Sequence, residues 1–305
     1  MRITQVMKQI KKRIAIQGWP GANHEIAAKA YFEEEDIDIV PCLTFPELFD
    51  ALKHDRDSYG IIAIENTLVG SLLPNYTMLK DSDLVIIGEY KLRIKHQFLA
   101  LAGQSIDDIT EVYSHPMAIM QCQAFFKDYP HIKLIESEDT ALSAKHIADG
   151  QLKGTGAIAS ELAADMYKLE TLAHNIETNK KNYTRFLIIT DKGKTEVDEL
   201  LEKGKVNKSS LVFSLPHEEG SLSKILTILA FYSINLTKIQ SLPIVGQEWE
   251  YLFYVDLTFT DYKRYLQSID AIRPLTSQLK SLGEYEKGKQ SYPIQNGHLS
   301  SDQSI

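Results

Sequence analysis

The sequence NYTRFLIIT, residues 182–190, places Thr184 and Arg185 immediately before an apolar run that is typical of a buried strand. An arginine is poorly suited to such a position unless an anion meets it, because its planar guanidinium binds carboxylates through paired hydrogen bonds. The neighbouring threonine can then act on the molecule that carries the carboxylate. Spacing alone favours a structural role, in which Thr184 caps or borders the strand and Arg185 forms an ordinary surface ion pair.

The bulk composition restricts the classes of function. The chain has 305 residues, 44% of them hydrophobic and 24% charged, and its formal net charge is −8. This length predicts about two domains, and the acidic balance argues against a nucleic-acid binder, which needs a basic face. Cys42 and Cys122 stand far apart and outside any metal-binding spacing. No apolar run approaches the ~18 residues of a membrane span, and no signal peptide is evident. We expect a soluble, cytoplasmic protein without contacts to membranes or nucleic acid.

Short apolar runs alternate with helical patterns up to residue 190, which predicts an α/β architecture. The following segment, 191–208, is charged and contains glycines, which is typical of a linker; a short helix is expected at about 197–201. Beyond it the order of the predicted elements is βαββαβ, which is ferredoxin-like. The polar residues 287–305 are predicted to be disordered. The strands of this last unit are expected at 210–215, 236–242, 251–259 and 282–285, and its helices at 222–232 and 262–275.

Polar residues follow several predicted strands of the first unit, where each strand gives way to a helix. Ligands bind at the carboxyl ends of strands in open α/β sheets, and helix N-termini there bind anions. Neither a lysine-containing glycine-rich loop nor a G-x-G-x-x-G pattern is present, so the pattern predicts a cleft for a small carboxylate rather than a phosphate. Taken singly, each residue is equally typical of a cap or turn. The segments concerned are 17–21, 65–67, 114–116, Ser160 and 184–185.

Together these segments resemble the motifs of the prephenate dehydratase family over about residues 13–286. The resemblance implies a two-lobed catalytic region, like a periplasmic binding protein, at 13–190, followed by an ACT domain at 209–286. The first lobe would hold 13–92 with 175–190, and the second 93–174. The matching motifs are QGWPGA at 17–22, AIENTLVG at 63–70, SHP at 114–116 with QC at 121–122, DTA at 139–141, AIAS at 157–160 and NYTRF at 182–186.

The resemblance implies a carbon–oxygen lyase of phenylalanine biosynthesis that converts prephenate to phenylpyruvate without a metal or cofactor. Thr184 would donate to the leaving oxygen at C4, and Arg185 would hold a carboxylate. Glu65 would act indirectly, because its charge would oppose a substrate carboxylate. The short segment before residue 13 leaves no room for a fused chorismate mutase, so a monofunctional enzyme is expected. The other substrate-binding residues implied are Asn66, Thr67, Gly70, Ser114, Ser160 and Phe186.

The similarity to ACT domains implies a phenylalanine effector site between two subunits, and thus a homodimer or homotetramer. Where the family has Gly-Ala-Leu and Glu-Ser-Arg-Pro, this chain has Gly220-Ser221-Leu222 and Gln240-Ser241-Leu242-Pro243. The family's Glu and Arg are both absent here. A purely structural or dimerising role therefore stays as open as feedback inhibition.

Two other functions also stay open. One is arogenate dehydratase, whose substrate carries an amino group in place of the keto group. An acidic partner for the ammonium would favour it, and the sequence places none. The other is a non-enzymatic amino-acid sensor, which would use Arg185 but would have no use for a proton donor at Thr184.

Overall fold

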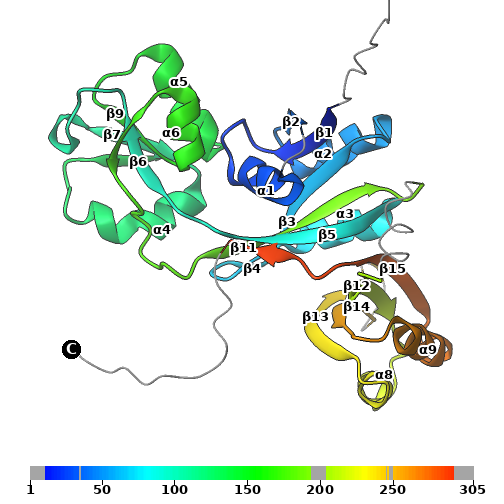
Figure 1. Ribbon diagram of the computed structural model, residues 1–305. Helices are drawn as coiled ribbons and strands as arrows, with labels where there is room; N and C mark the ends of the chain where they lie inside the picture. The colour runs from blue at the N-terminus through cyan, green and yellow to red at the C-terminus, as the bar shows by residue number, and fades with distance from the viewer. Residues whose placement is uncertain (1–10, 34–35, 194–203, 245, 247–249, 292–305) are drawn as a thin grey trace, which may run out of the picture.

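The computed structural model describes residues 11–33, 36–193, 204–244, 246 and 250–291. These residues form two α/β lobes and a smaller α/β domain that lies against the first lobe (Figure 1). The expected combination of a two-lobed α/β region with a C-terminal ferredoxin-like domain is confirmed.

A seven-stranded sheet forms the first lobe, in the order β16-β5-β11-β3-β1-β2, with β4 beside β3. Its central strands read YGIIAIEN (β3) and YTRFLIITD (β11), and nearly all of their residues are buried, as in strands covered on both faces. Helix α1 covers one face, and α2 and α3 cover the other. The elements are β1 (Lys12–Gln17), α1 (Asn23–Phe32), β2 (Ile37–Cys42), α2 (Phe45–His54), β3 (Tyr59–Asn66), β4 (Gly70–Ser71), α3 (Leu73–Asp81), β5 (Leu84–Arg93), β11 (Tyr183–Asp191) and β16 (Lys289–Gln290).

The second lobe contains a five-stranded sheet in the order β10-β6-β9-β7-β8. The chain enters this lobe after β5 and leaves it before β11, so two connections join the lobes (Figure 1). Each of its three α-helices has an N-cap residue whose side chain accepts a hydrogen bond from a backbone N–H of the first turn. These residues are His115, Asp139 and Ser160. The elements are β6 (Gln97–Ala100), β7 (Glu111–Ser114), α4 (Pro116–Phe126), β8 (Lys133–Glu136), α5 (Thr140–Gly150), β9 (Thr155–Ala159), α6 (Glu161–Tyr167) and β10 (Glu170–Ala173), with a short 3₁₀ turn at Ile106–Asp108.

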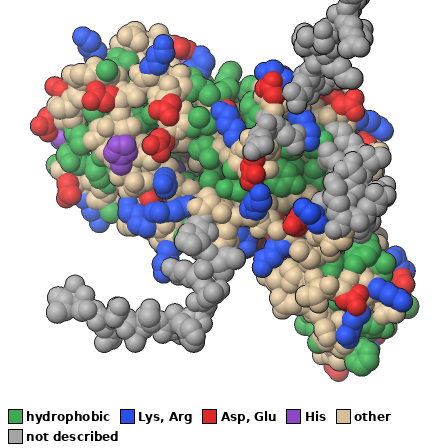
Figure 2. All heavy atoms as spheres, viewed as in Figure 1, with side chains coloured by type: hydrophobic (Ala, Val, Ile, Leu, Met, Phe, Trp, Pro, Cys, Tyr) green, Lys and Arg blue, Asp and Glu red, His purple; other side chains and the backbone are tan. Residues whose placement is uncertain are grey.

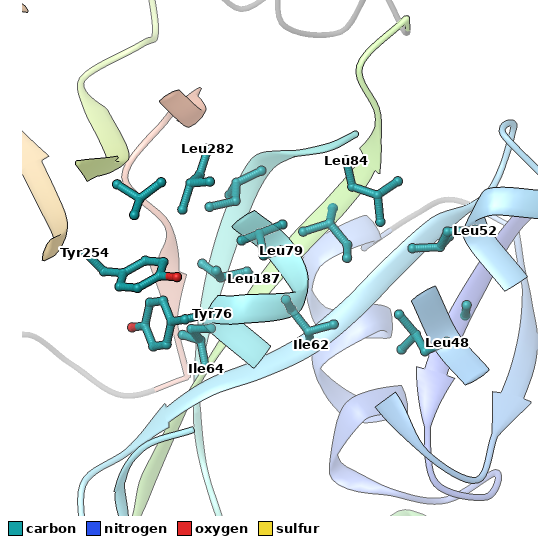
Figure 3. Close-up of a cluster of buried hydrophobic side chains, with 14 of the residues drawn as sticks. Leu48, Leu52, Ile62, Ile64, Tyr76, Leu79, Leu84, Leu187, Tyr254 and Leu282 are labelled. Carbon is teal, nitrogen blue, oxygen red and sulfur yellow. The ribbon is translucent and has the colours of Figure 1, made fainter. Parts of the chain in front are cut away.

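The C-terminal domain has a four-stranded sheet in the order β13-β14-β12-β15. Its two helices pack on one face of the sheet. The other face shares a core with the first lobe, in which Tyr254 and Leu282 pack with Tyr76 and Leu79 of α3 (Figure 3). The elements are β12 (Lys208–Ser214), α8 (Ser221–Phe231), β13 (Asn235–Pro243), β14 (Tyr251–Thr258), α9 (Tyr262–Ile272), a 3₁₀ turn (Arg273–Leu275) and β15 (Gln278–Tyr285).

The structure differs from the sequence-based expectations in the segment after β15. Disorder is expected from residue 287, but Lys289 and Gln290 form β16, which pairs in parallel with Tyr90 and Lys91 of β5. A polar dipeptide has no hydrophobic pattern, and its pairing depends on the edge that β5 offers. The helix expected at 197–201 and the remainder of the expected disordered tail, 292–305, lie outside the described residues.

The surface and the helices bear on possible partners. On the face shown in Figure 2, lysine and arginine side chains are interspersed with aspartate and glutamate over both lobes and the C-terminal domain. Such mixing leaves this face without a continuous basic patch. Among the described helices, none has the length and apolar character needed to cross a membrane.

Candidate active site

A cavity of about 240 Å³ lies between the two lobes. Its first wall is made by the start of α1, the end of β3 and the start of β11. Its second wall is made by the starts of α4 and α5, and residues between β5 and β6 close it at the lobe connection. The cavity thus lies at the carboxyl end of β3 and at several helix N-termini, where an open α/β sheet binds its ligands.

The pairing of β11 with β3 sorts the expected site residues onto two sides of the sheet. Thr184 lies opposite Asn66, and Arg185 lies opposite Glu65. Because successive side chains of a strand point to opposite faces, Thr184 and Asn66 face the inter-lobe cavity, together with Phe186. Arg185 and Glu65 line a second hollow at the C-terminal domain, which Thr184 also borders. Arg185 is absent from the lining of the inter-lobe cavity, and its expected role as a ligand of a substrate carboxylate stays a prediction.

Arg185 is bound by carboxylates of this same chain. Its Nε donates to Oε2 of Glu89 at 2.6 Å, its Nη1 bonds Asp256 of β14, and its Nη2 lies 3.2 Å from the Tyr285 hydroxyl. Lys208 adds a second cation, with Nζ 2.7 Å and 2.8 Å from the two Glu89 oxygens. Burial alone would raise the pKa of Glu89, but Arg185 and Lys208 lower it to about 2. This buried ionic cluster joins β11 to the C-terminal domain.

The hydroxyl of Thr184 has a defined direction. Oδ1 of Asn66 accepts the backbone N–H groups of Leu68 and Val69 at 2.9 and 3.1 Å. The amide NH₂ of Asn66 must therefore point the other way, and it donates to Thr184 Oγ1 at 2.9 Å and to Asn182 Oδ1 at 2.8 Å. Because a hydroxyl can accept and donate at once, Thr184 keeps its own proton for another acceptor, and its side chain borders the cavity.

The same network continues into the second lobe. Asn182 Nδ2 donates to Oε1 of Gln121 at 2.8 Å, and His96 Nε2 lies 2.8 Å from that oxygen. Since Gln121 Oε1 is the acceptor, His96 carries its proton on Nε2. Burial lowers the pKa of His96, so its ring is neutral at neutral pH. In the sequence Gln121 stands out only as part of the QC motif and His96 not at all, because neither shows a recognisable spacing to Thr184.

The donors that face the cavity are mainly neutral. Helices α1, α4 and α5 all begin in its walls, and the first N–H groups of a helix have no partner inside it. Neither lysine nor arginine is present among the described lining residues. Two acidic residues, Glu138 and Asp139, do lie there, and burial raises the pKa of Asp139. An anion in this cavity would therefore be held by helix N-termini and amides.

Four other expected substrate-binding residues lie outside the cavity lining. The fully buried Ser114 hydroxyl donates to Ile158 O at 2.6 Å, and Thr67 Oγ1 donates to Lys181 O at 2.9 Å. Gly70, at a φ of +87°, forms the turn into β4. The hydroxyls of Ser114 and Thr67 thus bond backbone carbonyls of segments that are distant in sequence, and the expected substrate contacts of these three residues stay predictions.

The fourth, Ser160, joins the lobes. Its hydroxyl caps α6 and donates to Gly21 O at 2.5 Å across the lobe boundary. Gly21 has a φ of +94°, and a Cβ there would lie 3.0 Å from Cα of Ala163. The two lobes therefore touch closely beside the cavity. Tyr167 adds a bond from its hydroxyl to Pro20 O at 2.6 Å.

The positions expected to form an effector site all belong to the C-terminal domain. Gly220, with a φ of +77°, precedes α8, and Ser221 and Leu222 form the first turn of this helix. The segment Gln240–Pro243 is the end of β13, one of the two edge strands of the sheet.

Comparison with known proteins agrees with this architecture. The family model "Prephenate dehydratase" matches residues 14–194. A bifunctional chorismate mutase/prephenate dehydratase of Aquifex aeolicus is 36% identical over 81% of this chain, and the match spans 66% of that protein, just under two thirds of its length. Arogenate dehydratase 2 of Petunia hybrida is 37% identical over 90% of this chain and 71% of its own. A solved structure described as GqqA, a novel type of quorum quenching acylase, superposes with a TM-score of 0.81 at 27% identity, covering 91% of this chain and 98% of that one.

The fold and the cavity define a two-lobed α/β enzyme that carries a C-terminal ACT domain. The chain belongs to the prephenate dehydratase family. This is a family of carbon–oxygen lyases in phenylalanine biosynthesis, and its relatives include both prephenate and arogenate dehydratases.

Proposed function

We propose that this protein converts prephenate to phenylpyruvate. The observation that carries the proposal is the directed hydrogen bond from Asn66 to Thr184, which leaves the Thr184 proton available in the cavity. In the reaction the bond from the ring to its carboxylate breaks, and the released electron pair completes the aromatic ring. As this happens the C4–O bond breaks with proton donation from Thr184, so that carbon dioxide and water leave, and the Thr184 oxygen regains a proton from solvent. Because aromatisation supplies the driving force, a positioned hydroxyl suffices as the donor.

The neutral character of the cavity supports decarboxylation. A cation beside the ring carboxylate would stabilise the charged ground state more than the transition state, in which this charge is being lost. Helix N-termini and amides can orient the carboxylate while stabilising its charged ground state less than a full cation would. The described lining residues supply such neutral donors and no lysine or arginine.

Arogenate is the second candidate substrate, because Glu138 and Asp139 lie in the cavity wall. A carboxylate there could pair with the ammonium group that distinguishes arogenate from prephenate. The test is to compare kcat/KM for the two substrates, following phenylpyruvate and phenylalanine respectively. We expect prephenate to be preferred. A preference for arogenate that falls in Glu138→Gln would overturn this choice.

Acyl transfer, the activity in the description of GqqA, has less support. A threonine nucleophile needs a base that takes its proton. Among the described residues, the Thr184 hydroxyl is bonded by the donating amide of Asn66 and by neither an imidazole nor a carboxylate.

The ACT domain is proposed to carry feedback by L-phenylalanine in a homodimer or homotetramer. Support comes from the exposed edge strand β13, since such edges pair readily with another chain, and from the ionic cluster that joins β14 to Arg185, the neighbour of Thr184. Light scattering should give an even number of subunits, and L-phenylalanine should inhibit turnover. A monomer that is insensitive to L-phenylalanine would contradict both statements.

A further inference from the structure

His24 is the second residue of α1 and lies in the wall of the inter-lobe cavity. Its side chain is buried, with 9% exposure. The ring lies edge-on to Phe186, with centroids 4.9 Å apart, and to Phe45 at 5.7 Å. Phe186 follows Thr184 by two residues on the same face of β11. The imidazole therefore belongs to the same wall as the proposed proton donor.

The Nε2 atom of His24 is sealed from solvent and has no hydrogen-bond partner in the described part of the chain. The other cavity histidines differ: His96 bonds Gln121 at 2.8 Å, and His115 Nδ1 accepts from the N–H of Met117 at 3.2 Å. A buried polar group without a partner costs about 1–3 kcal/mol, so it calls for an explanation. Since His24 lines the cavity and its Nε2 is enclosed, Nδ1 is the nitrogen left for a cavity ligand, and a proton on Nδ1 makes the enclosed Nε2 an unprotonated acceptor.

The charge state of His24 and its place on the helix indicate what it would bind. Burial lowers the pKa of His24 to about 3, so the ring is neutral at neutral pH and can donate one N–H. The backbone N–H groups of Asn23 and His24 belong to the first turn of α1, where the helix presents unpaired donors and the positive end of its dipole. All of these groups suit an anion.

We propose that the His24 imidazole and the first turn of α1 form the subsite for a carboxylate of the substrate. Nδ1–H of the ring would donate to one carboxylate oxygen, and the backbone N–H groups of residues 23 and 24 would bind the carboxylate at the helix end. This subsite rests on the proposed function, because prephenate supplies the carboxylate. It takes the role that the sequence suggested for Arg185, whose guanidinium is bound to Glu89 and Asp256 instead.

The test compares His24→Phe, which keeps an aromatic ring without a donor, with His24→Gln, which keeps an N–H donor. A hydrogen bond to a charged group is lost in the first, so KM for prephenate should rise about ten- to hundredfold while kcat changes by less than about threefold. His24→Gln should recover most of this loss. The matched control is His146→Phe, an exposed histidine of α5, which should leave KM unchanged.

The possible outcomes separate the subsite from the function. Wild-type turnover of prephenate with an unchanged KM in a folded His24→Phe variant would overturn the subsite and leave the proposed function standing. Equal loss of activity in His24→Phe and His24→Gln, with kcat rather than KM affected, would also overturn it, since that result indicates a packing role. If the folded wild-type protein does not turn over prephenate, the proposed function fails, and the subsite fails with it. Circular dichroism and thermal unfolding establish folding for each variant.

Discussion

The hydrogen bonding of the Thr184 hydroxyl is set by a series of linked amide groups. The backbone N–H groups of Leu68 and Val69 fix the oxygen of Asn66, and its NH₂ group then fixes Thr184 as a donor toward the cavity. No charged residue takes part in this step. The role of Asn66 is therefore to orient and polarise the Thr184 hydroxyl rather than to carry a proton itself.

Replacing Asn66 with alanine should mainly lower kcat. Without its donor the Thr184 hydroxyl can rotate and accept hydrogen bonds from elsewhere, so we expect a fall of roughly 10- to 1,000-fold in kcat, with KM changed much less. Steady-state formation of phenylpyruvate measures both constants. Asn179→Ala, at an exposed position, is the control and should behave as wild type. A variant at position 66 with unchanged kcat would exclude this role.

Replacing Arg185 with alanine should destabilise the protein strongly. Glu89 and Asp256 would lose a buried cation, and breaking a buried pair costs about 3–5 kcal/mol. The control is Arg13→Ala, because Arg13 pairs with Asp55 at the surface, where such a pair contributes about 0–1 kcal/mol. Urea unfolding measures both. Equal unfolding midpoints for the two variants would mean that the cluster contributes little to stability.

At the scale of the element, β11 shows what the sequence can and cannot indicate. Its apolar run predicts a buried strand at 186–190, and the strand is present. The adjacency of Thr184 and Arg185 suggested a shared ligand, but the two-residue period of a strand sends them to opposite faces. The groups that bond the Arg185 guanidinium come from distant parts of the sequence, with separations of 71 to Asp256, 96 to Glu89 and 100 to Tyr285.

Other elements differ in how clearly the sequence predicts them. Helix α2 is predicted by its capping box, and Thr44 does accept the Glu47 N–H at 3.3 Å. Helix α3, which reads LPNYTMLKD, has no strong apolar period and is not predicted. The sequence does not indicate a role for His24 either, because a single histidine in an otherwise ordinary helix carries no motif. Only the structure shows that its buried ring nitrogen lacks a hydrogen-bond partner.

The buried ionic cluster around Glu89 of β5 should make the free energy of unfolding depend on pH. The folded-state pKa of Glu89 is lowered to about 2, from a reference value of 4.5. The ionised Glu89 therefore contributes up to about 3 kcal/mol to the free energy of unfolding above pH 4.5, and this contribution is lost as the pH falls toward 2. In Glu89→Gln the free energy of unfolding should decline less steeply over that interval, although the variant is less stable at neutral pH. Parallel pH profiles for the two proteins would contradict this assignment.

At the scale of the whole molecule, the C-terminal domain is packed directly onto the catalytic region. Gly283 lies so close to β5 that a Cβ there would come within 2.2 Å of the Ile86 carbonyl oxygen. Tyr254 and Leu282 fill the shared core beside it (Figure 3). This contact joins the ACT domain to β5, and the Arg185 cluster joins it to β11, the strand that carries Thr184.

Gly283→Ala should loosen this contact. The added methyl group forces β15 away from β5, which we expect to lower stability by about 1–3 kcal/mol and to weaken any effect of L-phenylalanine. Thermal unfolding and inhibition curves measure the two effects. Gly150→Ala is the matched control, because a Cβ at that position meets only the Leu152 side chain at the end of α5. Identical unfolding curves for the two variants would argue against tight packing at this junction.

The most direct test of the account is the turnover of prephenate by the wild-type protein beside Thr184→Val and Thr184→Ser, without added metal or cofactor. Valine keeps the shape of threonine and removes the hydroxyl, whereas serine keeps it. The account predicts phenylpyruvate formation by the wild type, a fall in kcat of roughly 100- to 10,000-fold in Thr184→Val, and substantial recovery in Thr184→Ser. A wild-type protein that is inactive on prephenate, or a folded Thr184→Val variant with full turnover, would contradict it.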